Sequence, residues 1–189
     1  MRISGIKFQR PSEKTIRILK MIGVGVLVVG IGAVPPPWAL ARVLKELAMG
    51  DTQKNRRWAT RRIYEARRRG YVRGVGERYA LSDIGRRLVE EGKLWELKIS
   101  VPKRWDGRWH IVAFDIPQEL SKARIPFIRH LQNLGLVFYQ RSLWIHPHPC
   151  ADEVREIANF HGVLPHVSFI TATHVDGSAD LQRRFKITT

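Results

Sequence analysis

The chain has 189 residues, of which 44% are hydrophobic and 26% are charged, so its composition supports a packed core and excludes a wholly disordered chain. Lysine and arginine number 33 against 17 acidic residues, and the formal net charge is +16. Such a surface repels basic partners and attracts polyanions, with nucleic acid as the first candidate and an anionic membrane surface as the second. The single cysteine, Cys150, excludes an internal disulfide and fits a cytoplasmic location.

The charge is concentrated in the first half of the chain. Residues 1–98 carry 22 basic and 9 acidic residues, whereas residues 99–189 carry 11 and 8. Such asymmetry predicts two domains, a basic one that meets a polyanion and a nearly neutral one with another role. We place the first domain at residues 12–93, a linker at 94–108 and the second domain at 109–187.

An apolar run, residues 21–34, lies near the N-terminus and contains no charged residue. With basic residues before it and an Ala-Leu-Ala triplet at 39–41 after it, the run imitates a secretory signal. It is too short for an ordinary transmembrane helix, which needs about 20 apolar residues. The soluble interpretation is a buried helix over residues 13–33, ended by the prolines at 35–37. A membrane-anchored protein is the weaker alternative.

The next segments predict two helices, the second of them strongly basic. Residues 38–48 have a helical apolar period, and residues 54–69 hold eight basic residues and one glutamate. Within the basic helix, Ala59, Ile63 and Ala66 form a narrow apolar stripe. A narrow buried stripe with a broad basic face suits a helix laid into a DNA groove. The alternative is a merely solvated face, but such faces usually mix charge signs.

A β-hairpin and a further helix follow the basic helix. Residues 71–73 and 78–81 flank a glycine-containing turn, and Ser82 is placed to cap a helix over residues 83–91, which Gly92 would end. This order is that of a winged helix-turn-helix domain. The candidate DNA-binding side chains lie on the basic helix and the wing: Lys54, Asn55, Arg56, Arg57, Thr60, Arg61, Tyr64, Arg68, Arg73 and Arg78.

The second half alternates strand and helix patterns in the order βαββαβ, which is ferredoxin-like. The predicted elements, in chain order, are strand 109–115, helix 117–134, strands 136–140 and 142–146, helix 151–160 and strand 167–173. The expected fold class is therefore α+β, a winged helix-turn-helix followed by a ferredoxin-like domain.

Two stretches of the second half resemble a known family. Residues 105–117 (WDGRWHIVAFDIP) and 134–147 (LGLVFYQRSLWIHP) are similar to the central domain of PaaX-type transcriptional repressors. That domain is itself similar to the Cas-two nucleases of CRISPR adaptation, which are ferredoxin-like dimers. The resemblance covers about residues 12–187, since PaaX-type proteins place a winged helix before this domain. It implies a homodimer that regulates transcription.

The resemblance also implies one candidate catalytic and metal-binding residue. Asp115 matches the metal-associated aspartate at the end of the first Cas-two strand, and in a twofold dimer two such carboxylates could share Mg²⁺. The alternative is a carboxylate that caps the helix starting near Pro117. One strong carboxylate per chain favours the cap. The alternating His146, His148 and Cys150 offer zinc-type ligands, but their spacing favours a proline-rich strand exit.

The sequence therefore predicts a cytoplasmic, PaaX-type transcription regulator that binds double-stranded DNA as a homodimer, without a membrane partner or a cofactor. The alternative is a Cas-two-like, CRISPR-associated endonuclease that needs Mg²⁺, or a structural subunit of an adaptation complex. The balance leans against an enzyme. Because the chain stops soon after the last predicted strand, a small-molecule effector such as an acyl-coenzyme A is not expected.

Overall fold

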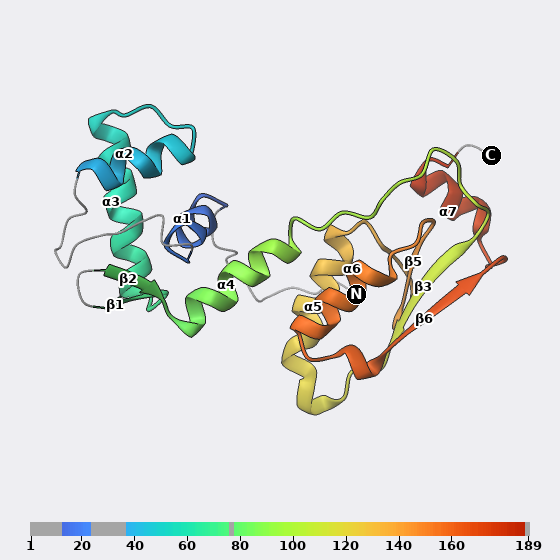
Figure 1. Ribbon diagram of the computed structural model, residues 1–189. Coiled ribbons are helices and arrows are strands. Elements are labelled where there is room, and N and C mark those ends of the chain that lie inside the picture. Colours follow the sequence, from blue (N-terminus) through green and yellow to red (C-terminus); the bar gives the residue numbers. More distant parts are fainter. Residues whose placement is uncertain (1–12, 24–36, 76–77, 188–189) are drawn as a thin grey trace. The chain divides into compact units, whose positions relative to one another are not determined.

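The computed structural model describes residues 13–23, 37–75 and 78–187. The chain divides into two compact units, Met1–Gly92 and Lys93–Thr189, each with its own antiparallel sheet (Figure 1). The mixed α+β class is thus the predicted one.

The first unit follows the predicted order of elements. Its helices and strands, in chain order, are α1 (Glu13–Gly23), α2 (Pro37–Glu46), α3 (Gln53–Arg68), β1 (Val72–Val75), β2 (Arg78–Leu81) and α4 (Asp83–Leu94). The helix predicted for residues 13–33 is described as far as Gly23, and residues 24–33 lie outside the described residues. The same holds for Gly76 and Glu77 between β1 and β2. None of the described helices is long and apolar enough to cross a membrane.

Helices α1, α2 and α3 meet in one apolar core. Leu19 of α1, together with Val43 and Leu44 of α2, is fully buried there. The contribution of α3 is the stripe predicted from the sequence, because Ala59, Ile63 and Ala66 are its buried residues. Burying only one narrow stripe leaves the rest of the α3 surface available for other contacts.

Helix α4 begins as predicted but ends later. The Ser82 hydroxyl oxygen accepts a hydrogen bond from the Gly85 backbone N–H at 3.0 Å, which caps the helix. The prediction that Gly92 ends this helix is wrong, since α4 continues to Leu94. A Cβ at position 92 would lie 2.7 Å from Cγ2 of Ile16. Gly92 therefore serves the close approach of α1 rather than a helix end.

The second unit contains a four-stranded antiparallel sheet with the order β4-β5-β3-β6. Its elements are β3 (Trp109–Phe114), the 3₁₀ turn η1 (Gln118–Leu120), α5 (Ser121–Asn133), β4 (Val137–Gln140), β5 (Leu143–His146), α6 (Ala151–Phe160), η2 (Leu164–His166), β6 (Val167–Ala172) and α7 (Ser178–Phe185). Up to β6 this is the predicted βαββαβ order, with β3 in the centre of the sheet.

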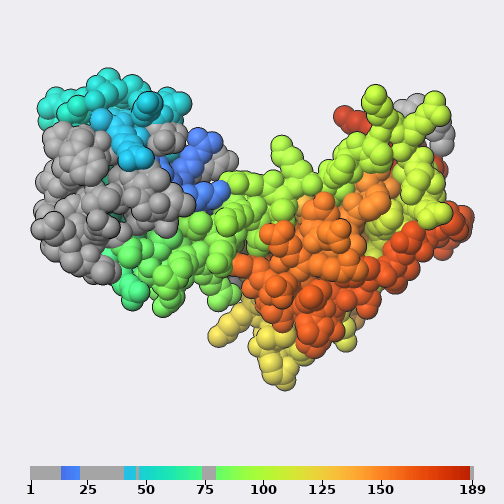
Figure 2. Space-filling view, in the orientation of Figure 1, coloured from blue at the N-terminus to red at the C-terminus, as the bar shows by residue number. Residues whose placement is uncertain are grey.

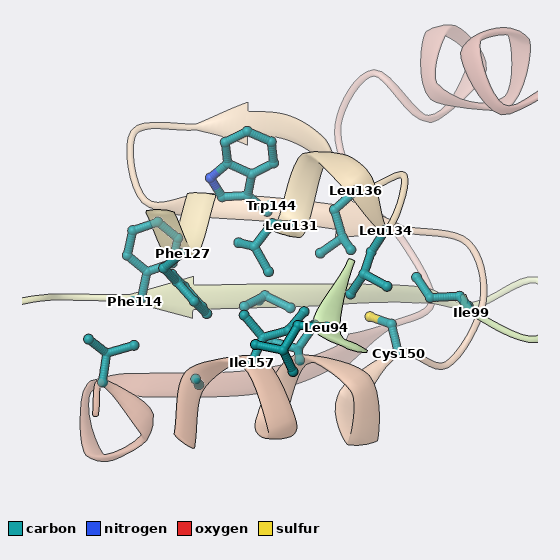
Figure 3. Packing of buried hydrophobic residues seen from close by; sticks show 14 of the residues in the cluster. Leu94, Ile99, Phe114, Phe127, Leu131, Leu134, Leu136, Trp144, Cys150 and Ile157 are labelled. Atoms are coloured by element: carbon teal, nitrogen blue, oxygen red, sulfur yellow. The ribbon is translucent and has the colours of Figure 1, made fainter. Parts of the chain in front are cut away.

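One face of this sheet packs against α5 and α6. Phe114 of β3 and Phe127 of α5 meet edge to face, with ring centroids 5.3 Å apart (Figure 3). Leu94 and Ile99 are buried in the same cluster. The segment 94–108, expected to be a linker, therefore contributes to the core of the second unit in its first part.

The other sheet face carries a second apolar cluster, built on Trp109, Ile111 and Ile145 and covered by α7 through Leu181. Helix α7 was not predicted. It has eight residues and only two apolar positions at helical spacing, Leu181 and Phe185, which is too little periodicity to detect.

Candidate nucleic-acid interface

The basic helix α3 presents one continuous exposed face opposite its buried stripe. The Thr52 side chain caps the helix by accepting from the Asn55 backbone N–H at 3.2 Å. Residues three or four positions apart share a helix face. The face turned away from Ala59 and Ile63 carries five exposed side chains, which we call the α3 stripe: Lys54, Arg57, Arg61, Tyr64 and Arg68.

Three other predicted DNA-binding residues of α3 already have partners within the protein. The Asn55 side-chain amide donates to the Gly50 carbonyl at 2.6 Å. The Arg56 guanidinium donates two hydrogen bonds to the Asp51 carboxylate, at 2.5 and 2.7 Å. These bonds lower the pKa of Asp51. The Thr60 hydroxyl donates to the Arg56 carbonyl at 3.0 Å. The structure thus divides the predicted residues of α3 into an outward group and a group held internally.

The single acidic residue of α3, Glu65, lies between two arginines. Its carboxylate oxygens are 3.1 Å from Arg61 Nε and 3.0 Å from Arg62 Nη1. Arg61 keeps 82% of its side chain exposed, so this ion pair is weak. Arg62 also lies over the Trp58 ring, 5.8 Å from its centroid. Arg57 and Arg68, like Lys54, are exposed and have no ion pair among the described residues.

The two remaining predicted contacts belong to the β1–β2 hairpin. Its strands pair in register from Val72 opposite Leu81 to Val75 opposite Arg78. Arg73 of β1 is exposed. Arg78 begins β2, and its side chain lies outside the described part of the structure. The hairpin therefore offers Arg73 as its described cation.

Asp115 follows β3 on the surface of the second unit, and its expected capping role is wrong. Its backbone N–H donates to the His166 carbonyl at 3.0 Å. The 3₁₀ turn η1 intervenes before α5, and neither helix start has a side-chain cap. The Asp115 side chain instead lines a shallow pocket of about 470 Å³ beside Ser142, His166 and Ser168.

The surroundings of Asp115 do not fit a metal held by one chain. Among the described residues, no three histidine, cysteine, aspartate or glutamate side chains are grouped to hold an ion. Mg²⁺ usually takes one or two carboxylates in addition to substrate phosphates and waters, and here Asp115 would be the one carboxylate, without a group of further ligand side chains around it in the part of the chain that the structure describes. We therefore derive no catalytic step from Asp115.

The structure also does not gather His146, His148 and Cys150 into a metal site. The His146 ring nitrogen Nδ1 lies 3.1 Å from the His148 backbone N–H, which donates to it. Burial lowers the pKa of His146 to about 4. Cys150 is packed in the core beside α5 and α6, where burial raises its pKa to about 12. It is therefore a buried apolar side chain rather than a ligand or a nucleophile.

Comparison with known proteins places the second unit in a family. Residues 102–183 match the family model of the PaaX protein central Cas2-like domain, a range that contains the whole sheet, α5, α6 and most of α7. No curated protein matches the chain. Residues 102–183 therefore belong to the PaaX central Cas2-like domain family.

Proposed function

We propose that this chain is a transcription regulator whose first unit is a winged helix-turn-helix that binds double-stranded DNA through α3. The observation that carries the proposal is the α3 stripe, a row of cations opposite the buried stripe of the same helix. The order of three helices, a two-stranded antiparallel sheet and a further helix supports it. The PaaX-type second unit supports a regulatory role.

The side chains of the α3 stripe suit the chemistry of a duplex. An arginine guanidinium binds phosphate oxygens with two parallel hydrogen bonds and also reads guanine edges in the major groove. Tyr64, which is 57% exposed, adds a hydroxyl that can donate to a phosphate. Arg73 of β1 would reach the backbone beside the groove. Arg56 would have to leave Asp51 before it could contact DNA.

The test compares two pairs of arginines on the same helix. Changing Arg57 and Arg68 to glutamine removes two outward cations with little change in helix propensity. If both contact phosphates, the salt dependence of DNA binding falls by about 0.9 per contact on a log–log scale. Fluorescence anisotropy of a labelled duplex, titrated between about 50 and 200 mM salt, measures this slope.

The matched control changes Arg56 and Arg62 to glutamine. It removes the same charge from the same helix, but from side chains that pair with Asp51 and Glu65. We expect its slope to stay close to that of the unaltered protein. Equal slopes for both variants would show that only net charge matters and would reject the α3 stripe as the contact surface.

We further propose that the protein binds DNA as a homodimer formed by the second unit. Strands β4 and β6 are the two edges of the sheet, and edges that are not covered tend to pair with another chain. Each edge also has an exposed apolar side chain, Phe138 at 53% and Ile170 at 47%.

Light scattering of the full chain tests the dimer. We expect a mass twice the 21.8 kDa of one chain at micromolar concentration, and a shift towards one chain after Ile170→Asp. Lys122→Asp, an exposed change on α5, should leave the mass unchanged. A monomer mass for the unaltered protein would refute the proposal without touching the role of α3.

A further inference from the structure

The surplus of positive charge in residues 99–189 comes from two short segments. Residues 103–108 and 183–186 hold six of the 11 basic residues found in 99–189 and one of its eight acidic residues. The remainder of 99–189 carries five basic and seven acidic residues. The surplus charge of this half therefore comes entirely from a loop before β3 and from the end of α7.

The loop before β3 is held by its own hydrogen bonds. Trp105 Nε1 donates to the Arg108 carbonyl at 2.9 Å, and the Arg108 N–H donates to the Asp106 carboxylate at 2.9 Å. Gly107 has a φ of 75°, the left-handed conformation that closes this turn. The Trp105 ring packs on Trp109 with centroids 4.9 Å apart. Fixing the tryptophan on the sheet leaves the neighbouring cations exposed.

The end of α7 is anchored on the same cluster. The Phe185 ring lies 6.1 Å from the Trp109 ring, and Ile187 also packs there. Lys186 has a φ of 54°, and the Ile187 N–H donates to the Gln182 carbonyl at 3.0 Å, which closes the helix end. Arg183 pairs with Asp180. Arg184 and Lys186 are exposed.

The loop and α7 therefore present their cations around one aromatic centre, Trp109. Figure 1 shows the yellow-green loop before β3 passing beside the red α7 at one end of the second unit, and Figure 2 shows the exposed surface of this loop. The exposed cations without an ion pair among the described residues form what we call the second basic patch: Lys103, Arg104, Arg108, Arg184 and Lys186. A groove lined by Arg183 and Lys186 adjoins it.

We propose that the second basic patch is a nucleic-acid contact surface of its own, which binds the phosphate backbone of a duplex. Three of its five cations are arginines, which suit phosphate oxygens. A membrane surface would require exposed apolar side chains beside the cations. Here the apolar neighbours Trp105, Phe185 and Ile187 are turned into the cluster instead. Val101, just before the loop, is exposed, but one valine is a small apolar area. A cationic surface of this kind fits a phosphate backbone, which carries no sequence information.

The experiment compares two charge-matched variants of the full chain. The patch variant changes Arg104, Arg108 and Arg184 to glutamine. The control variant changes Lys122, Arg141 and Arg155, three exposed cations elsewhere in the second unit, to glutamine. Both keep the α3 stripe intact. Binding to a random-sequence duplex is measured as a function of salt, and thermal unfolding checks that both variants remain folded.

We expect the patch variant to lower the salt slope by about 0.9 for each phosphate that it no longer binds, and affinity at 0.1 M salt to fall roughly tenfold for each. The control should match the unaltered protein. An unchanged slope for the patch variant, or equal losses in both variants, would overturn the proposal. So would binding to phosphatidylserine vesicles that the patch variant loses while its DNA binding is unchanged. Because Arg57 and Arg68 are untouched, failure here leaves the test of the α3 stripe standing, and the reverse also holds.

Discussion

Replacing Gly85 with alanine will destabilise the first unit by about 3 kcal/mol, because the added methyl group has no room. A Cβ at this position would lie 1.9 Å from the Tyr71 carbonyl oxygen. That oxygen accepts the Ser82 N–H at 3.0 Å, and the Ser82 hydroxyl in turn caps α4 at Gly85. The methyl group therefore pushes apart the hairpin and the first turn of α4. The gain in helix propensity, about 1 kcal/mol, offsets only part of this cost.

Urea unfolding followed by circular dichroism measures the change. Gly50→Ala is the matched control, since a Cβ there meets nothing within 4 Å. We expect the control to lie within about 0.5 kcal/mol of the unaltered protein. A Gly85→Ala protein as stable as this control would mean that α4 does not pack on Tyr71 as described.

The second large effect is a loss of stability in acid that depends on His146. This side chain is 6% exposed, and burial lowers its pKa to about 4, with the neighbouring His148 and His110 opposing its charge further. An unfolded histidine titrates near pH 6.5. Between about pH 6.5 and pH 4, His146 is protonated in the unfolded chain but stays neutral in the folded unit. The free energy of unfolding therefore falls as the pH drops through this range. The pKa difference corresponds to about 3 kcal/mol at most.

The measurement is the free energy of unfolding at several values between pH 7 and pH 4, followed by tryptophan fluorescence. Four of the six tryptophans lie in the second unit, so the signal reports mainly on it. His146→Gln should flatten the pH dependence, whereas His174→Gln, at a side chain that is 84% exposed, should not. A His146→Gln protein that loses stability with the same pH profile would place the acid-sensitive group elsewhere.

Much of the fold follows from sequence patterns, because its elements carry local signals. Helix α6 has the predicted bounds, with Pro149 before it and a clear apolar period. The buried stripe of α3 was also predicted residue by residue. The end of α4 was not predicted correctly, because Gly92 does not end the helix. It leaves room for the Ile16 side chain of α1, which is far away in the sequence. A glycine that serves a tertiary contact looks the same in sequence as one that ends a helix.

The sequence predicts which helix carries the candidate site, but not which side chains of that helix are free to contact DNA. The excess of basic residues and the helical spacing of the apolar residues identify α3 as the candidate DNA-binding helix. Only the structure reveals that Arg56 is paired with Asp51, whereas Arg57 is exposed. Those two arginines are neighbours in the sequence and differ only in helix face. The second basic patch was missed for the opposite reason. Its two segments are about eighty residues apart and come together only because Trp105 and Phe185 pack on the same tryptophan.

The burial of Cys150 makes the natural chain a convenient background for site-specific labelling. It is the only cysteine, it is 2% exposed, and its pKa of about 12 leaves almost no thiolate at neutral pH. Maleimide dyes will therefore not react with Cys150. They will react with cysteines introduced at exposed positions, such as Gly50 in the first unit and Glu156 in the second. A donor and an acceptor fluorophore at these two positions would report the distance between the units, with and without a duplex, without removing any native residue from the core.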